Sequence, residues 1–186
     1  MFRCLIFTFI FVPFAATASA RDEKSIKDFR DALVALAPDV DRGEAELLSV
    51  TAHTTSRALE HEYGAFGPPA LQNFFVHVGV RRRGYCFHWA RDIGVRLKQL
   101  RLKTLVLYWG AAGAGTRHEH NCIVVCARRQ RFRDGIIIDG WRYAGRLLWQ
   151  PITKDSKYKW AEDLQESAWL QDYRPRKQTR GANAQR

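Results

Sequence analysis

Apolar residues recur at helical spacing in the first half of the chain. Residues 25–37 carry an apolar stripe on one helical face, and Ser25 followed three residues later by a carboxylate approximates a capping box. The pattern predicts a first helix over 25–37 and a second over 44–63, followed by a Gly- and Pro-rich break at 64–69. Residues 70–80 fit a short helix or a strand, and we favour a helix.

A further amphipathic helix is predicted to begin at Cys86. Its buried face is formed by apolar residues at regular intervals, namely Ala90, Ile93, Leu97 and Leu100. Gly84 allows a sharp turn into the helix. A thiol at this end faces unpaired backbone N–H groups and the positive end of the helix dipole, which favour the thiolate, and the arginines at 81–83 add positive charge. The residues alone equally fit a small buried hydrophobe.

The second half of the chain has the pattern of strands. Residues 103–109 form an apolar run rich in β-branched and aromatic side chains, and 118–127, 136–141 and 146–149 continue the series. Short connections between successive strands predict an antiparallel meander covered by helices, hence an α+β fold. A closing helix is predicted over 157–171, with an inward face of Trp160, Leu164 and Trp169.

The two ends of the chain differ from this central part. Residues 1–20 combine a positive start, a short apolar stretch and a small-residue cleavage site, which is typical of an export signal cut after Ala20. We expect a single domain over 21–173, a basic disordered tail over 174–186, and a periplasmic or secreted protein that is not integral to the membrane after cleavage. An uncleaved anchor is the alternative.

Charge narrows the range of partners. The formal net charge of +11 favours anionic partners such as envelope lipids, acidic cell-wall polymers or nucleic acid. Most basic residues are scattered and no nucleic-acid-binding motif is found, so we expect no nucleic acid partner. The Gly-rich stretch at 110–115 lacks the spacing of a phosphate-binding loop and is predicted to be a flexible loop. We therefore expect no nucleotide and no other cofactor.

Signal removal would leave three cysteines, Cys86, Cys122 and Cys126. In an oxidising compartment this odd number leaves at least one thiol unpaired within the chain. Cys122 and Cys126 on one strand would lie about 13 Å apart, beyond the ~7 Å limit for a disulfide. Either one of them pairs with Cys86, or Cys86 is free.

Three residues in chain order have the chemistry of nucleophilic catalysis. A thiol such as Cys86 needs a base that takes its proton and later returns it, and an imidazole such as His120 suits this task. A carboxylate can then fix the imidazole, and antiparallel strands can place Asp139 beside His120. Asp139 ends an Ile-rich run, so it must lie at the sheet edge or be paired. His118 is an alternative base on the same strand face, but His120 adjoins the apolar run directly.

Three segments resemble the papain-like fold in its transglutaminase-like branch, which includes bacterial periplasmic cysteine proteinases: GYCFHWA at 84–90, HNCIVV at 120–125 and IIIDGW at 136–141. The resemblance covers residues 70–150. It implies a papain-like core in which the Cys-bearing helix packs on an antiparallel sheet behind N-terminal helices.

The same resemblance implies a thiolate–imidazolium pair of Cys86 and His120, oriented by Asp139. The implied reaction is acyl transfer at an amide, with water or an amine as acceptor and a protein or cell-wall peptide as substrate. Calcium, which some relatives use, has no identifiable loop in this chain, so no metal is expected.

The usual oxyanion-hole side chain has no clear counterpart, so an inactive member of the superfamily is a further alternative. Gln72, 14 residues before Cys86, is expected to be too distant. Tyr85 and the backbone N–H of Cys86 are candidate donors. Trp89 and Trp141 are candidate substrate-binding residues or walls of the core.

Two other classes of function are open. His118, His120 and Cys122 alternate on one strand, and with Cys86 they could form a tetrahedral zinc site of a hydrolase or a periplasmic metal-binding protein. A non-catalytic envelope-binding domain would instead join Cys86 to Cys122 or Cys126 by a disulfide. Its positive charge would hold it to anionic envelope components.

Overall fold

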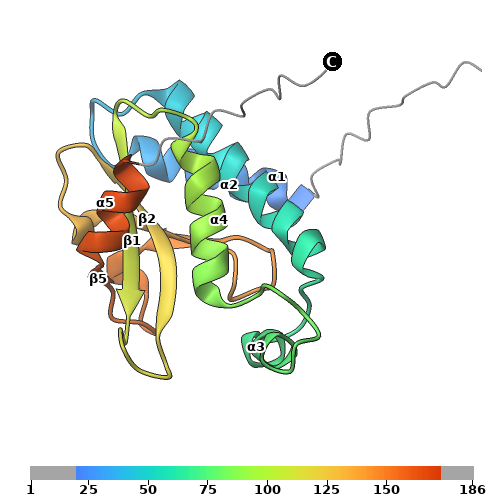
Figure 1. Cartoon of the computed structure of the whole chain (residues 1–186). Helices are drawn as coiled ribbons and strands as arrows, with labels where there is room; N and C mark the ends of the chain where they lie inside the picture. Colours follow the sequence, from blue (N-terminus) through green and yellow to red (C-terminus); the bar gives the residue numbers. More distant parts are fainter. Residues whose placement is uncertain (1–19, 173–186) are drawn as a thin grey trace, which may run out of the picture.

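Five α-helices and a five-stranded antiparallel sheet make up residues 20–172, the part of the chain that the computed structural model describes (Figure 1). This confirms the predicted α+β class. The predicted basic tail, and the export signal apart from Ala20, lie outside the described residues. No helix within 20–172 is both long enough and apolar enough to cross a membrane.

The helices are α1 (Ala20–Val34), α2 (Arg42–Tyr63), α3 (Pro69–His77), α4 (Cys86–Lys98) and α5 (Leu164–Asp172). The predicted cap at Ser25 is wrong, because Ser25 lies inside α1. Its hydroxyl accepts a hydrogen bond from Trp149 Nε1 at 2.9 Å and contacts His53 Nε2 at 2.9 Å. Helix α2 starts earlier than predicted because Asp41 caps it, accepting from the Glu44 N–H at 2.8 Å.

The strands are β1 (Leu105–Ala112), β2 (His120–Ala127), β3 (Ile136–Asp139), β4 (Leu148–Pro151) and β5 (Ala161–Glu162), in the sheet order β4-β3-β2-β1-β5. The predicted meander is confirmed for β1 to β4. The predicted closing helix is wrong at its start, because residues 161–162 pair with β1 and the helix begins only at Leu164. Leu164 is 74% exposed rather than inward, and Trp160 precedes the helix.

Strand β1 continues into residues that were predicted to be a loop. Gly110, Ala111 and Ala112 pair with Cys122, Asn121 and His120 of β2. Small residues are needed here, since a Cβ at Gly110 would lie 3.0 Å from Cys122 Sγ. This pairing places His120 at the end of the sheet, where β2 begins.

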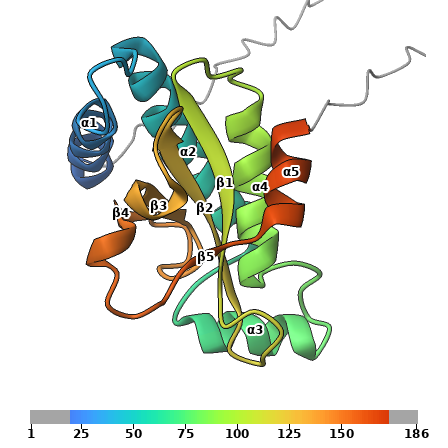
Figure 2. The same cartoon turned by 90° about the vertical axis from the view of Figure 1, so that its left-hand side faces the viewer.

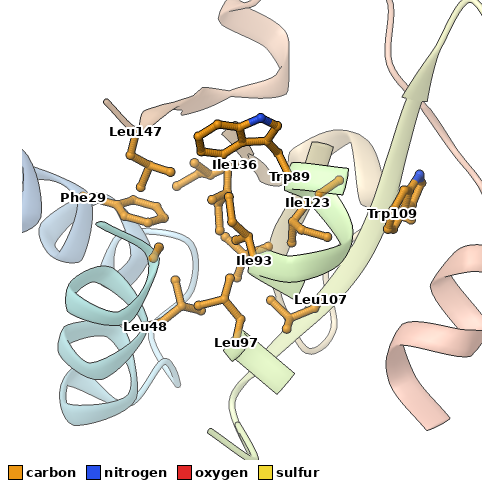
Figure 3. Close-up of a cluster of buried hydrophobic side chains, with 14 of the residues drawn as sticks. Phe29, Leu48, Trp89, Ile93, Leu97, Leu107, Trp109, Ile123, Ile136 and Leu147 are labelled. Atoms are coloured by element: carbon orange, nitrogen blue, oxygen red, sulfur yellow. The ribbon is translucent and has the colours of Figure 1, made fainter. Parts of the chain in front are cut away.

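Both faces of the sheet are buried. The helices cover one face over the cluster shown in Figure 3, which includes Phe29, Leu48, Trp89, Ile93, Leu97, Leu107, Trp109, Ile123, Ile136 and Leu147. Figure 2 shows α4 and α5 side by side along β1. The other face carries Cys122, Val124, Cys126 and Ile137, which pack against the short 3-10 helices Phe132–Asp134 and Ile152–Lys154 and against Trp160. All eight residues of β2 are buried as a result.

Candidate active site

Cys86 is the first residue of α4, as predicted, and its side chain is nearly buried, with 8% of the residue exposed. Gly84 precedes the helix with a φ of +147°, a conformation that side chains disfavour. The sulfur lies 3.7 Å from the Glu119 carbonyl oxygen and 3.8 Å from Asn121 Nδ2. The thiol therefore sits where α4 meets the start of β2.

Two of the three arginines before Cys86 have partners elsewhere. Arg83 forms an ion pair with Asp92 at 2.8 Å. The Arg81 guanidinium lies over the rings of Phe66 and Phe75, at 4.8 and 4.7 Å from their centroids. Arg81 and Arg83 are therefore held by residues other than Cys86.

His88, two residues after Cys86, turns back toward the start of α4 rather than into solvent. The side chain is half-buried, and its Nδ1 accepts hydrogen bonds from the backbone N–H groups of Gly84 at 3.1 Å and Tyr85 at 3.3 Å. Burial and the charge of Arg83 lower the pKa of His88, which keeps the ring neutral and able to accept. His88 thus fixes the turn that presents Cys86.

His120 and Asp139 lie side by side, as the strand pattern predicted. His120 Nε2 is 2.6 Å from Asp139 Oδ2, and the two residues are 1% and 2% exposed. Burial alone would raise the pKa of Asp139, but the hydrogen bond from His120 and the charge of Arg142 lower it. Burial alone would lower the pKa of His120, but Asp139 and Cys86 raise it. The pair therefore favours carboxylate beside imidazolium.

The other nitrogen of His120 is available as a base. Nδ1 is buried and has no hydrogen-bond partner among the described residues. Because the carboxylate of Asp139 only accepts, Nε2 carries the proton in the neutral ring, and Nδ1 holds the lone pair. The side chain of Cys86 interacts with this ring and contributes to its raised pKa. The thiol is thus the neighbouring group whose proton Nδ1 can take.

Arg142 and Asp155 extend the pair into a buried charge network that the sequence analysis missed. Arg142 Nε donates to Asp139 Oδ2 at 2.7 Å, and its two terminal nitrogens pair with the carboxylate of Asp155. Asp155 also accepts from Trp160 Nε1 at 2.8 Å. Two carboxylates and one guanidinium leave one negative charge, which an imidazolium at His120 neutralises. The Asp-x-x-Arg spacing was a signal for Arg142, but no local pattern points to Asp155.

Three aromatic rings surround the His120 ring. Their centroids lie at 4.6 Å for Tyr158, 4.7 Å for Trp141 and 5.3 Å for Trp160. Burial raises the pKa of Tyr158, which keeps the phenol neutral. The rings exclude water from the imidazole and strengthen its interaction with Asp139. Only Trp141 was a candidate from sequence.

Asn121 is a further polar group at the thiol that was missed. Its Oδ1 accepts from Trp109 Nε1 at 2.8 Å, which fixes the amide orientation, and its Nδ2 donates to Glu119 Oε1 at 3.0 Å. The same Nδ2 lies 3.8 Å from Cys86 Sγ. Asn121 therefore brings an N–H donor to the nucleophile from the helix-covered face of β2.

The remaining candidates take different places. Trp89 is 1% exposed and packs in the core, with its ring edge-on to Tyr63, so it does not line an open surface. Tyr85 is half-buried and its ring stacks on Phe87 at 5.8 Å. Gln72 is fully buried and donates to the Trp141 carbonyl oxygen at 3.2 Å. Helix α3 thus packs onto the loop that follows Asp139.

The ligands of the alternative zinc site do not lie together in the structure. His118 lies in the turn before β2 and is exposed, so it does not share a strand face with His120. Cys122 is 1% exposed, and burial raises its pKa well above the usual thiol value. Within residues 20–172 no three His, Cys, Asp or Glu side chains are grouped so as to hold a metal ion.

The alternative disulfide between Cys86 and Cys122 or Cys126 is not formed. Cys86, Cys122 and Cys126 are all free thiols. Cys86 belongs to the core cluster under the helices, whereas Cys122 and Cys126 pack on the opposite face of the sheet. An envelope-binding domain held by a Cys86 disulfide is therefore wrong in that detail.

Comparison of the chain with protein-family models, with curated proteins and with solved structures finds no match.

Proposed function

We propose that this chain is a thiol hydrolase or acyltransferase that acts on amide bonds through Cys86, His120 and Asp139. The observation that carries the proposal is the buried imidazole of His120, which is bound at Nε2 by Asp139, interacts with the Cys86 side chain and has no other hydrogen-bond partner at Nδ1 among the described residues. A transglutaminase-like member of the papain-like superfamily would have this order of residues. Its substrate would be a protein or a cell-wall peptide in the periplasm or outside the cell.

The chemistry follows from the positions of the groups. His120 Nδ1 takes the thiol proton, and the Cys86 thiolate attacks the carbonyl carbon to form a carbon–sulfur bond. The imidazolium then protonates the departing amine as the carbon–nitrogen bond breaks, leaving a thioester. Water or an amine, deprotonated by the same nitrogen, attacks the thioester and releases Cys86 as a thiol. Asp139 holds the Nε2–H tautomer and stabilises the imidazolium in both steps.

Two donors could stabilise the oxyanion of the tetrahedral intermediate. The backbone N–H of Cys86 lies in the first turn of α4, where helix N–H groups have no acceptor within the helix. Asn121 Nδ2 lies 3.8 Å from the sulfur and is held in place through Trp109. Asn121 would take the place of the oxyanion side chain that the sequence analysis could not assign.

The test is the rate at which Cys86 is alkylated as a function of pH, followed by peptide mass mapping on chelator-treated protein. An activated thiol should react at pH ~6 faster than a free thiol of pKa about 8.5, and His120→Ala should abolish this advantage. Cys122 and Cys126 are internal controls, because burial raises the pKa of both and they should stay unlabelled in the folded chain. Labelling of Cys86 that follows a free thiol, with no effect of His120→Ala, would contradict the proposal.

Substrate screening follows a positive labelling result. Cys86→Ala should abolish hydrolysis and transamidation while it leaves the fold intact, as measured by circular dichroism. Retained activity in this variant would refute the assigned nucleophile.

A further inference from the structure

A group of apolar side chains is exposed around α3, beside the start of α4. Of the nine residues of α3 only Gln72 is buried. Figure 1 shows α3 beyond the Cys86 end of α4, away from the sheet. The most exposed large apolar residues of this region are Phe66 at 54%, Phe74 at 56%, Val78 at 48%, Val80 at 68% and Phe87 at 44%. We call these five residues the α3 surface.

Two residues of the α3 surface, Phe74 and Val78, continue an exposed stripe that begins at Ala70. Ala70, Phe74 and Val78 follow one another at four-residue spacing and are all exposed, so they form one unpartnered helical stripe. Gly79 then turns the chain with a φ of +76°, and Val80 extends the apolar patch beyond the helix. A core helix would bury such a stripe.

The charge around the α3 surface has a single sign. Residues 63–91 contain no Asp and no Glu but contain four arginines. Arg83 and Arg91 are neutralised by carboxylates outside this stretch, at 2.8 and 3.2 Å. Arg81 and Arg82 form no ion pair with any residue of 20–172, and the Arg81 guanidinium lies over the two neighbouring rings of Phe66 and Phe75. Two unneutralised cations thus follow Val80 directly in the chain, and Arg81 lies against Phe66 of the patch.

We propose that the α3 surface docks the protein onto an anionic lipid bilayer. Phe74, Val78 and Val80 would enter the boundary between headgroups and acyl chains, and Arg81 and Arg82 would bind lipid phosphates. Apolar burial and attraction to anionic lipid act together in such interfacial binding. A projecting apolar stripe beside cations can insert into a bilayer, whereas binding of a peptide would need a groove. Since Phe87 adjoins Cys86, docking would bring the thiol close to the membrane surface.

The test is co-sedimentation of the chain from Arg21 onward with vesicles of phosphatidylcholine alone or mixed with phosphatidylglycerol. Binding is expected only to the anionic vesicles and should weaken with salt. Phe74→Ser should weaken binding about tenfold, because the exposed part of a phenyl ring no longer enters the lipid. Arg82→Gln should weaken it about fivefold.

Matched controls come from other exposed positions. Leu164→Ser, on α5 and 74% exposed, and Arg129→Gln, at an exposed position between β2 and β3, should bind vesicles like the wild type. No binding to anionic vesicles, or equal losses in Phe74→Ser and Leu164→Ser, would overturn the proposal. So would unchanged vesicle binding in Phe74→Ser with slower turnover of a peptide, which would make the surface a substrate rim. Cys86→Ala should bind vesicles normally, so this test is separate from that of the thiol chemistry.

Discussion

The most informative single change is Asp139→Asn, because this carboxylate accepts four hydrogen bonds and an amide cannot accept all of them. Oδ2 accepts from His120 Nε2 at 2.6 Å and from Arg142 Nε at 2.7 Å. Oδ1 accepts from the backbone N–H groups of Trp141 at 2.9 Å and Arg142 at 3.2 Å. An asparagine has one acceptor oxygen and one donor NH2 group, so either orientation sets the NH2 group against two of these donors. His120 can relieve its own clash only by moving its proton to Nδ1, the nitrogen that must act as the base.

The magnitude follows from these lost acceptors. Removing one partner of a buried ion pair costs about 3–5 kcal/mol, and two unsatisfied donors at 1–3 kcal/mol each give about the same figure. In a domain of this size we expect the melting temperature to fall by about 10 °C. The imidazolium of His120 also loses its counter-charge, which lowers the pKa of His120 and should slow Cys86 alkylation at pH ~6 at least about tenfold.

The assay combines thermal unfolding with the alkylation rate of Cys86 between about pH 5.5 and 9. Asp155→Asn is the matched control, because Asp155 binds Arg142 and Trp160 but its contacts do not include His120. It should lower stability while it leaves most of the reactivity at low pH. A folded Asp139→Asn protein with the wild-type alkylation profile would refute the assigned role of Asp139.

Three further outcomes are expected. His53 is buried, and burial lowers its pKa, so its contribution to stability is present above about pH 6.5 and is lost as the pH falls. In His53→Gln, the free energy of unfolding in urea should therefore decrease less steeply with falling pH than in the wild type. The contribution of His120 to stability should depend on pH in the opposite direction, because its raised pKa gives stability below about pH 6.5 that is lost as the pH rises through the folded-state value. If the free energy of unfolding of His120→Gln decreased with rising pH as steeply as that of the wild type, this would be contradicted. Gly140→Ala should cost about 1–3 kcal/mol of unfolding free energy, since its Cβ would lie 2.7 Å from Ser56 Oγ. In the same variant Cys86 labelling should slow, because Gly140 follows Asp139.

Much of the candidate site was predictable because its parts lie at the ends of regular elements. The apolar stripe behind Cys86 fixed the start of α4, and the apolar run after His120 fixed β2 to within two residues. Short connections then required antiparallel neighbours, which brings the first residue of one strand beside the last residue of the next. The contact of His120 with Asp139 follows from that topology.

Other parts of the site have no local pattern. Residues 152–156 were assigned to no element and 157–160 to the closing helix. The segment 152–160 instead folds back over the sheet, because its apolar members cover Cys122, Val124 and Ile137. This return brings Tyr158 against the imidazole and Asp155 against Arg142. The predicted helix over 157–171 failed for the same reason, since pairing of 161–162 with β1 outweighs helical propensity.

The sequence by itself determined the three chemical groups, their order and the ends of the elements that carry them, because these depend on periodicity and chain direction. Only the tertiary structure decided which face of the sheet each side chain of β2 occupies. A strand buried on both faces has a continuous apolar pattern, so alternation cannot distinguish the faces. That is why the approach of Asn121 to the thiol, the inert position of Cys122 and the free Nδ1 of His120 became visible only in the folded chain.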